Sequence, residues 1–254
     1  MSVGSVVRRF ADLDALSRAA ADELAAIARA AVADRGTCSL ALSGGSTPKR
    51  LFQLLAQRGR DALPWDHIEL WWGDESTVPP DHADSNYRMT REALLDPLGL
   101  PLGLAASHVH PIDGALADHD AAARAYERAL VTALGSPPVF DLVLLGMGPD
   151  GHTASLFPGS PALAETARWV VANPVTSPLV HGSTTRITLT APALNAARKI
   201  WFLVAGADKA ATLAQVLEGP RDSTRYPSQL IAPRSGDLVW FVDAAAAASL
   251  RGVP

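Results

Sequence analysis

Four short stretches of the chain combine residue types that could bind and activate a small polar molecule. They are "SGGSTP" (43–48), "GDES" (73–76), "GMGPDGH" (146–152) and "GADKA" (206–210). Each follows an apolar run of the kind that forms a buried strand. Because ligands in open α/β sheets bind beyond the carboxyl ends of the strands, the four stretches together predict one shared site.

The first stretch has the composition of an anion-binding loop. Its two glycines let backbone N–H groups approach a ligand closely, and its hydroxyls are further donors. A helix-like pattern follows, with Pro48 suited to the first helical position, and a helix N-terminus favours anions. Neither a GxxxxGK nor a GxGxxG motif begins in this stretch, which argues against a nucleotide site there. The expected phosphate-binding residues are Ser43, Gly44, Gly45, Ser46 and Thr47, although a tight turn with a capped helix explains the stretch equally well.

His152 is the candidate catalytic residue. It follows Asp150 and Gly151 on a glycine-rich loop after a buried strand. An unperturbed imidazole titrates near pH 6.5 and can accept a proton from water, and Asp150 could orient or charge-stabilise it. A lone loop histidine is more often simply exposed, so the catalytic interpretation depends on the neighbouring strand ends.

Charged residues at the other strand ends complete the candidate site. Asp74 and Glu75 could bind sugar hydroxyls, transfer protons or form an acidic turn. Lys209 lies in the first turn of a predicted helix, where the helix dipole disfavours a cation, so a bound anion would explain it. Arg186, at the start of a predicted strand, is a weaker candidate of the same kind. A solvated surface residue is the alternative for both cations.

Alternating strands and helices must position these loops. Apolar periodicity predicts helices over 12–34, 48–58, 87–95 and 120–134, one after 199–206, and a terminal one over 243–250. Apolar runs predict strands over 38–42, 67–74, 139–148, 168–173, 186–190, 199–206 and 237–243, with 108–112 a weak strand or a loop. This alternation predicts an α/β fold, a parallel sheet with helices on both faces. Residues 1–254 are expected to form a single domain.

Composition excludes several classes of function. The net charge of −4 argues against a nucleic-acid or anionic-membrane surface, and no apolar run is long enough to span a membrane. The single cysteine, Cys38, allows no intrachain disulfide and fits a reducing cytoplasm. His108 and His110 share a strand face without a third ligand nearby, so no metal site is predicted. No GxSxG motif supports a serine hydrolase.

Five segments, in order, resemble the 6-phosphogluconolactonase family: "LALSGGSTPKRLF", "WWGDESTVPPDHADSNYRM", "DLVLLGMGPDGHTASLFPGS", "RITLTAPALNAARKIWFLVAGADKA" and "DLVWFVD". The resemblance implies a Rossmann-like, mostly parallel sheet. It implies hydrolysis of 6-phospho-D-glucono-1,5-lactone to 6-phosphogluconate in the oxidative pentose phosphate pathway, with no metal or organic cofactor. The expected partner is that small sugar-phosphate lactone, and the expected state is a cytoplasmic monomer or small homo-oligomer.

The resemblance also implies roles for matching positions. The 43–47 loop and Lys209 would hold the 6-phosphate, and His152 would activate water with Asp150 close by. Asp74 and Glu75 would line the sugar site, with charge from Arg186. Backbone N–H groups from Gly148 to Gly151 could stabilise a developing oxyanion.

One departure from the family and one rival family leave two alternatives open. The family usually reads Asp-Glu-Arg where this chain has Ser76, so a phosphate-binding guanidinium is missing unless Lys49, Arg50 or Arg88 replaces it. A non-catalytic sugar-phosphate-binding protein is therefore one alternative. Amino-sugar phosphate deaminases or isomerases are the other, but their glutamate falls on Phe157, which favours lactone hydrolysis.

Overall fold

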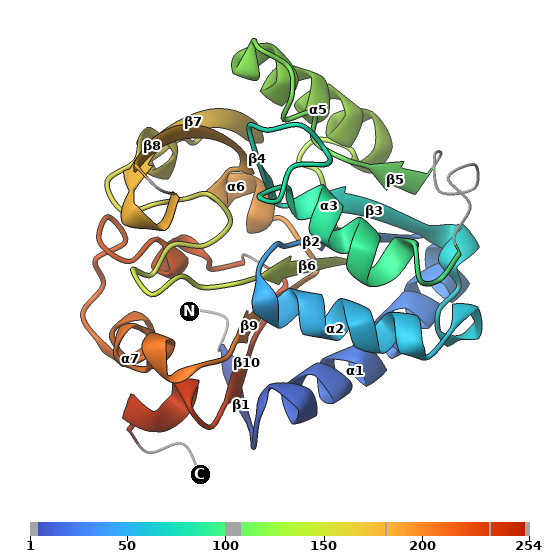
Figure 1. The fold of residues 1–254 in the computed structure, drawn as a ribbon, viewed down its shortest axis with the longest axis horizontal. Helices are drawn as coiled ribbons and strands as arrows, with labels where there is room; N and C mark the ends of the chain where they lie inside the picture. Colours follow the sequence, from blue (N-terminus) through green and yellow to red (C-terminus); the bar gives the residue numbers. More distant parts are fainter. Residues whose placement is uncertain (1–4, 100–107, 181, 234, 252–254) are drawn as a thin grey trace.

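A parallel sheet forms the centre of the computed structural model, which describes residues 5–99, 108–180, 182–233 and 235–251. Within these ranges seven strands pair in the order β1-β10-β9-β6-β2-β3-β5 (Figure 1). All six strand pairs are parallel. The strands are β1 (Val6–Phe10), β2 (Cys38–Leu42), β3 (Ile68–Trp72), β5 (Val109–His110), β6 (Leu142–Leu145), β9 (Lys199–Val204) and β10 (Asp237–Asp243). The predicted mostly parallel α/β fold is confirmed.

The helices cover both faces of this sheet. They are α1 (Leu13–Arg35), α2 (Ser46–Gln57), α3 (Asn86–Thr90), α5 (His119–Leu134), α6 (Ala191–Leu194) and α7 (Ala210–Glu218). Figure 1 shows α1, α2 and α3 together on one side and α6 and α7 on the other. Among the helices of the described residues, none combines the length and apolarity needed to cross a bilayer.

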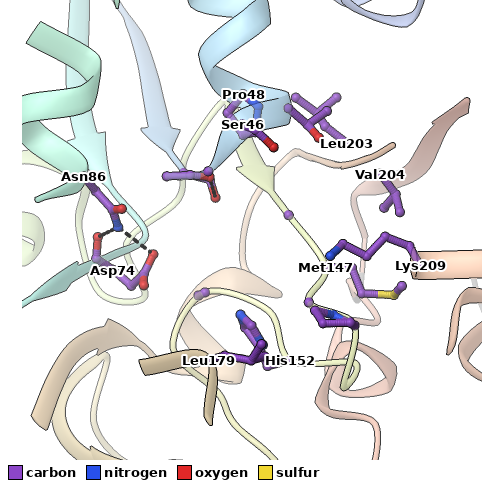
Figure 2. A pocket seen from close by; sticks show the side chains of 18 of the residues that line it. Ser46, Pro48, Asp74, Asn86, Met147, His152, Leu179, Leu203, Val204 and Lys209 are labelled. Atoms are coloured by element: carbon purple, nitrogen blue, oxygen red, sulfur yellow. Dashed lines mark hydrogen bonds between the residues drawn. The ribbon is translucent and has the colours of Figure 1, made fainter. Parts of the chain in front are cut away.

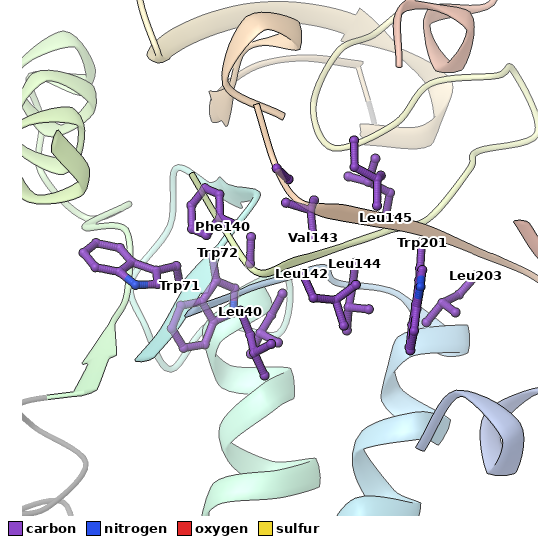
Figure 3. Close-up of a cluster of buried hydrophobic side chains, with 14 of the residues drawn as sticks. Leu40, Trp71, Trp72, Phe140, Leu142, Val143, Leu144, Leu145, Trp201 and Leu203 are labelled. Carbon is purple, nitrogen blue, oxygen red and sulfur yellow. The ribbon is translucent and has the colours of Figure 1, made fainter. Parts of the chain in front are cut away.

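The core is built from the middle strands. Every residue of β2 and β6 is buried, as expected for parallel strands covered on both faces. Large side chains from neighbouring strands fill the space between the sheet and the helices, including Trp71, Trp72 and Trp201 (Figure 3). This packing holds the carboxyl ends of the central strands, and the loops that follow them, in fixed positions.

A second sheet corrects the predicted topology. The stretches 168–173 and 186–190 do not join the parallel sheet. Most of their residues lie in β7 (Val170–Ser177) and β8 (Gly182–Leu189), which pair antiparallel with each other. The strand β8 also pairs antiparallel with β4 (Asp74–Ser76). The short connection between β7 and β8 permits only a hairpin, since a parallel crossover needs a dozen or more residues.

Gly73 explains why one predicted strand became two. The stretch 67–74 was expected to be continuous, but β3 ends at Trp72 and β4 begins at Asp74 in the other sheet. The N–H of Gly73 donates to the carbonyl of Leu42, and its own carbonyl accepts from the N–H of Leu189. One residue thus joins both sheets and places Asp74 beside β8.

Several other expectations were inaccurate. The strand β1 was missed, because two arginines interrupt its apolar pattern. The strand predicted over 139–148 is restricted to β6, and the terminal helix is a 3₁₀ turn over Ala246–Ser249. The helix α2 begins at Ser46, which puts Pro48 at the third helical position. Proline is still tolerated there, since the first N–H groups of a helix have no partner within it.

Candidate active site

A cavity of about 300 Å³ opens at the carboxyl ends of β2, β6 and β9 (Figure 2). All four stretches singled out in the sequence contribute to its wall: Ser43, Gly44, Gly45, Ser46, Thr47, Asp74, Gly146, Met147, Gly148, Pro149, His152 and Lys209. Other elements add Asn86, Phe157, Leu179 and Arg186. The structure therefore brings together loops separated by more than a hundred residues of sequence.

The 43–47 loop presents backbone donors to this cavity. Gly45 has a φ of 98° and is the N-cap of α2, where it offers no side chain to bond the first N–H groups. Those groups lie at the positive end of the helix dipole, which suits an anion. Gly44 is required for another reason, because a Cβ atom there would lie 1.8 Å from Oδ1 of Asn86.

His152 and Asp150 form a hydrogen-bonded pair. Nδ1 of His152 lies 2.6 Å from Oδ1 of Asp150, and the backbone N–H of His152 donates to the same oxygen. Burial alone would raise the pKa of Asp150, but the hydrogen bonds and charge of His152 outweigh burial and lower it. Because an ionised carboxylate only accepts, Nδ1 of His152 is the donor in this pair. In the neutral form of the ring, the lone pair is therefore on Nε2.

The loop glycines position His152 and do not form the expected oxyanion site. The N–H of Gly148 donates to the carbonyl of His152, and that of Gly151 donates to the carbonyl of Gly148. Gly151 has a φ of 83° and does not line the cavity. The suggestion that these N–H groups stabilise an oxyanion, and the placement of Gly151 among the substrate-binding residues, are therefore corrected.

Asp74 is the centre of a buried polar network. Its Oδ2 accepts from Ser155 Oγ at 2.6 Å and from Arg186 Nη2 at 3.0 Å. Asn86 Nδ2 donates to the carbonyl of Asp74 at 2.9 Å (Figure 2). Arg186 thus pairs with a carboxylate at the cavity wall. Sequence reasoning missed Asn86 and Ser155, whose only signal was their place within segments shared with the family.

Glu75 does not line the cavity, which corrects its expected place in the sugar site. Successive side chains of a strand point to opposite sides, so Glu75 points away from the side that Asp74 faces. It is 2% exposed and accepts from the backbone N–H groups of Asn86 and Tyr87. Burial raises its pKa despite these donors. Glu75 anchors the start of α3 and so positions Asn86.

The cationic side chains that line the cavity are those of Lys209 and Arg186. Neither is one of the residues that the sequence suggested as replacements for the missing family arginine. Lys209 follows β9, and its Nζ lies 2.6 Å from the exposed carboxylate of Asp208. The suggested replacements for the family arginine lie elsewhere: Arg50 pairs with Asp14, Arg88 pairs with Glu92, and Lys49 lines a separate groove on α2.

The two histidines that were considered as metal ligands pair with a carboxylate instead. His108 and His110 each lie 2.5 Å from an oxygen of Glu69 at the edge of the sheet. Within the described ranges, no group of three or more histidine, cysteine or acidic side chains is arranged to hold a metal ion.

The fold and the cavity define a class: Rossmann-like α/β proteins with an Asp–His pair and a glycine-rich turn that leads into a helix at one sheet edge. Residues 11–240 match the family model described as glucosamine-6-phosphate isomerases/6-phosphogluconolactonase. The chain belongs to this family.

Relatives with known names support the same assignment. The chain is 44% identical to the 6-phosphogluconolactonase of a Synechocystis species, over 87% of this chain and 88% of the relative. It is 40% identical to that of Mycobacterium tuberculosis, over 98% and 99%. Among solved structures, 6-phosphogluconolactonase from Trypanosoma cruzi superimposes with a TM-score of 0.83 at 32% identity, covering 99% of both chains. A monomeric glucosamine-6-phosphate deaminase, 22% identical with a TM-score of 0.79, shares the fold.

Proposed function

We propose that this chain hydrolyses 6-phospho-D-glucono-1,5-lactone to 6-phospho-D-gluconate, the lactonase step of the oxidative pentose phosphate pathway. The observation that carries the proposal is the position of the Asp150–His152 pair. His152 lines the same cavity as the 43–47 loop and Lys209, so a base and a candidate anion site share one binding space. The names of the similar proteins support the same substrate.

The substrate is bound at two ends of the cavity. In Figure 2, Lys209 lies on one side of His152, and Asp74 and Asn86 lie on the other. The phosphate is held by Lys209 and by the free N–H groups of α2, which combine a charge with a helix N-terminus. The sugar hydroxyls meet Asp74 and Asn86, with Arg186 behind them. This arrangement presents the ring ester to His152.

The chemistry needs one base and water. Nε2 of His152 accepts a proton from water while the water oxygen bonds to C1 of the lactone. Collapse of the tetrahedral intermediate breaks the ring C–O bond, and the imidazolium returns its proton to the ring oxygen. The acid product then ionises in water. Asp150 balances the transient positive charge on the imidazole. General-base catalysis by a positioned side chain such as His152 raises the rate by about 10²–10⁴-fold.

The alternatives are less well supported. A deaminase of this family uses a carboxylate where this chain has Phe157, whose ring is buried and apolar. A protein that only binds sugar phosphates has no use for a half-buried carboxylate that fixes the tautomer of a histidine.

A direct assay tests the proposal. Freshly prepared 6-phosphogluconolactone is added to the purified protein, and acid release is followed in a pH-stat after subtraction of spontaneous hydrolysis. We expect catalysed hydrolysis and no ammonia from glucosamine 6-phosphate. Ammonia release without lactone hydrolysis would assign the chain to the deaminases, and binding without either reaction would make it a sensor.

A further inference from the structure

The ring of Phe157 lies nearly flat against the imidazole of His152. The ring centroids are 4.2 Å apart, and the planes differ by 18°. Phe157 belongs to the cavity wall but is only 5% exposed, so most of its surface is packed against protein. One face of the proposed base is thus covered by an aromatic ring that has no role in the proton transfers.

Two other contacts confine the imidazole at its edge. Asp150 holds Nδ1 at 2.6 Å. A Cβ atom on Gly148 would lie 2.1 Å from Nδ1 and 2.2 Å from Cε1, so this edge of the ring rests directly on the backbone. Both contacts act near one nitrogen. A ring held there can still tilt about the hydrogen bond, and only a contact on its face opposes that tilt.

Phe157 is itself held by the loop that carries it. The N–H of Leu156 donates to the carbonyl of Thr153 at 2.9 Å, and the N–H of Ser160 donates to the carbonyl of Phe157 at 3.0 Å. Thr153 is fully buried, and its hydroxyl donates to the carbonyl of Gly146 at 2.8 Å. These bonds tie the loop to the end of β6, so Phe157 can act as a fixed support.

We propose that Phe157 is a positioning residue for lactone hydrolysis, whose ring fixes the plane of the His152 imidazole so that Nε2 faces the bound lactone. The inference rests on the proposed function. Because reacting groups must be held within fractions of an ångström, a tilted base lowers the rate of the chemical step while substrate binding persists. The phosphate and hydroxyl contacts involve other residues, so KM should change little.

Variants at position 157 distinguish the effect of a flat aromatic ring from the effect of an apolar side chain of similar size. Phe157→Leu and Phe157→Met keep an apolar side chain but remove the flat face, and each is expected to lower kcat by about 10- to 100-fold with KM within about threefold. Phe157→Tyr keeps the ring and should retain kcat within about threefold. Phe241→Leu is the matched control, because Phe241 of β10 is also buried, stacks on Phe10 of β1 and does not line the cavity. It should lower the unfolding temperature and leave kcat unchanged.

The kinetic outcome decides between positioning and general packing. A kcat within twofold of wild type in both ring-removing variants would overturn the inference, as would an equal loss in Phe241→Leu. A wild-type protein without lactonase activity would instead overturn the proposed function.

An NMR measurement tests the inference without any substrate. Long-range ¹H–¹⁵N spectra of the imidazole should show a single Nδ1-protonated ring for His152 in wild type and in Phe157→Tyr. They should show an averaged or second ring environment in Phe157→Leu. Identical His152 spectra in all three proteins would contradict the inference, whatever the substrate is.

Discussion

Ser76 and Arg186 are partners across the antiparallel pair of β4 and β8, and the guanidinium of Arg186 donates to the Ser76 hydroxyl. Position 76 is where the resemblance to the family leads us to expect an arginine, and this chain has a serine. The small side chain leaves Arg186 free to reach Asp74, whose Oδ2 lies 3.0 Å from Nη2. A positive charge therefore stands beside Asp74, supplied from the neighbouring strand.

Loss of that charge should destabilise the protein. The side chains of Arg186 and Asp74 are only 16% and 6% exposed, so Arg186→Met leaves a buried carboxylate without its cation. Removal of one partner of a buried pair costs about 3–5 kcal/mol of unfolding free energy, measured by urea denaturation. The double variant with Asp74→Asn should recover part of this loss. A double variant less stable than Arg186→Met would show that the pair is not the cause.

His152→Ala tests the base. We expect kcat to fall by about 10²–10⁴-fold, with KM changed by less than about threefold and the unfolding temperature retained. His67→Ala is the control, because His67 is exposed and precedes the amino end of β3, at the opposite edge of the sheet from the cavity. A near-normal kcat in His152→Ala would show that the His152 imidazole is not the general base.

Lys209→Gln tests the phosphate site. A hydrogen bond to a charged group contributes about 1.5–3 kcal/mol, so KM should rise about 10- to 100-fold while kcat changes little. Lys199→Gln removes a lysine that pairs with Asp237 outside the cavity, and it should leave both constants unchanged. Steady-state kinetics on fresh lactone measure both. An unchanged KM in Lys209→Gln would place the phosphate elsewhere.

Gly44→Ala tests the close approach of the loop to α3. The new Cβ would meet Oδ1 of Asn86 at 1.8 Å, so one of them must move, at a cost of about 1–3 kcal/mol of unfolding free energy. KM should rise as well, because Asn86 lines the sugar end of the cavity. The second change Asn86→Ala removes the clash and should recover the part of the stability loss that exceeds the cost of losing the Asn86–Asp74 hydrogen bonds, though it should not restore KM. Gly73→Ala is the control, since its Cβ would meet only Leu42 O, at an ordinary 3.5 Å.

Asp150→Asn tests a pH dependence of stability. The folded pKa of Asp150 lies below its ordinary value of 3.8, so the ionised form contributes stability above that value, which is lost as pH falls through the folded pKa. Asparagine does not titrate. The advantage of wild type in unfolding free energy should therefore narrow from about pH 5 to about pH 2, measured by denaturant unfolding at each pH. A constant difference would show that Asp150 is not held ionised by His152.

Much of the central sheet could be predicted from sequence, and the reason is periodicity. Short continuous apolar runs that end at glycines, such as Leu142–Leu145, are typical of strands buried on both faces. The long helix α1 was equally clear, with Asp12 as its N-cap and Gly36 in the left-handed conformation at its end. These signals are local, so one stretch of sequence contains all of them.

The second sheet was not predictable in the same way. Strands β7 and β8 look like further members of an alternating series, and their antiparallel pairing depends on a short hairpin connection and on packing against α5. The side-chain directions of Glu75 and Arg186 were not predictable from sequence either. Which side of β4 faces the cavity, and which carboxylate a guanidinium reaches, depend on how two sheets meet at Gly73.

By itself, the sequence determined the kinds of groups at each strand end: a bare hydroxyl-rich turn, two carboxylates, an Asp–Gly–His loop and a lysine. It also determined the family. Only the tertiary structure decided which of them share a cavity, that Asp74 enters it and Glu75 does not, and that Phe157 covers the imidazole. The physical reason is that residue type and period are properties of neighbours along the chain, whereas orientation and pairing come from contacts between segments that the chain brings together only on folding.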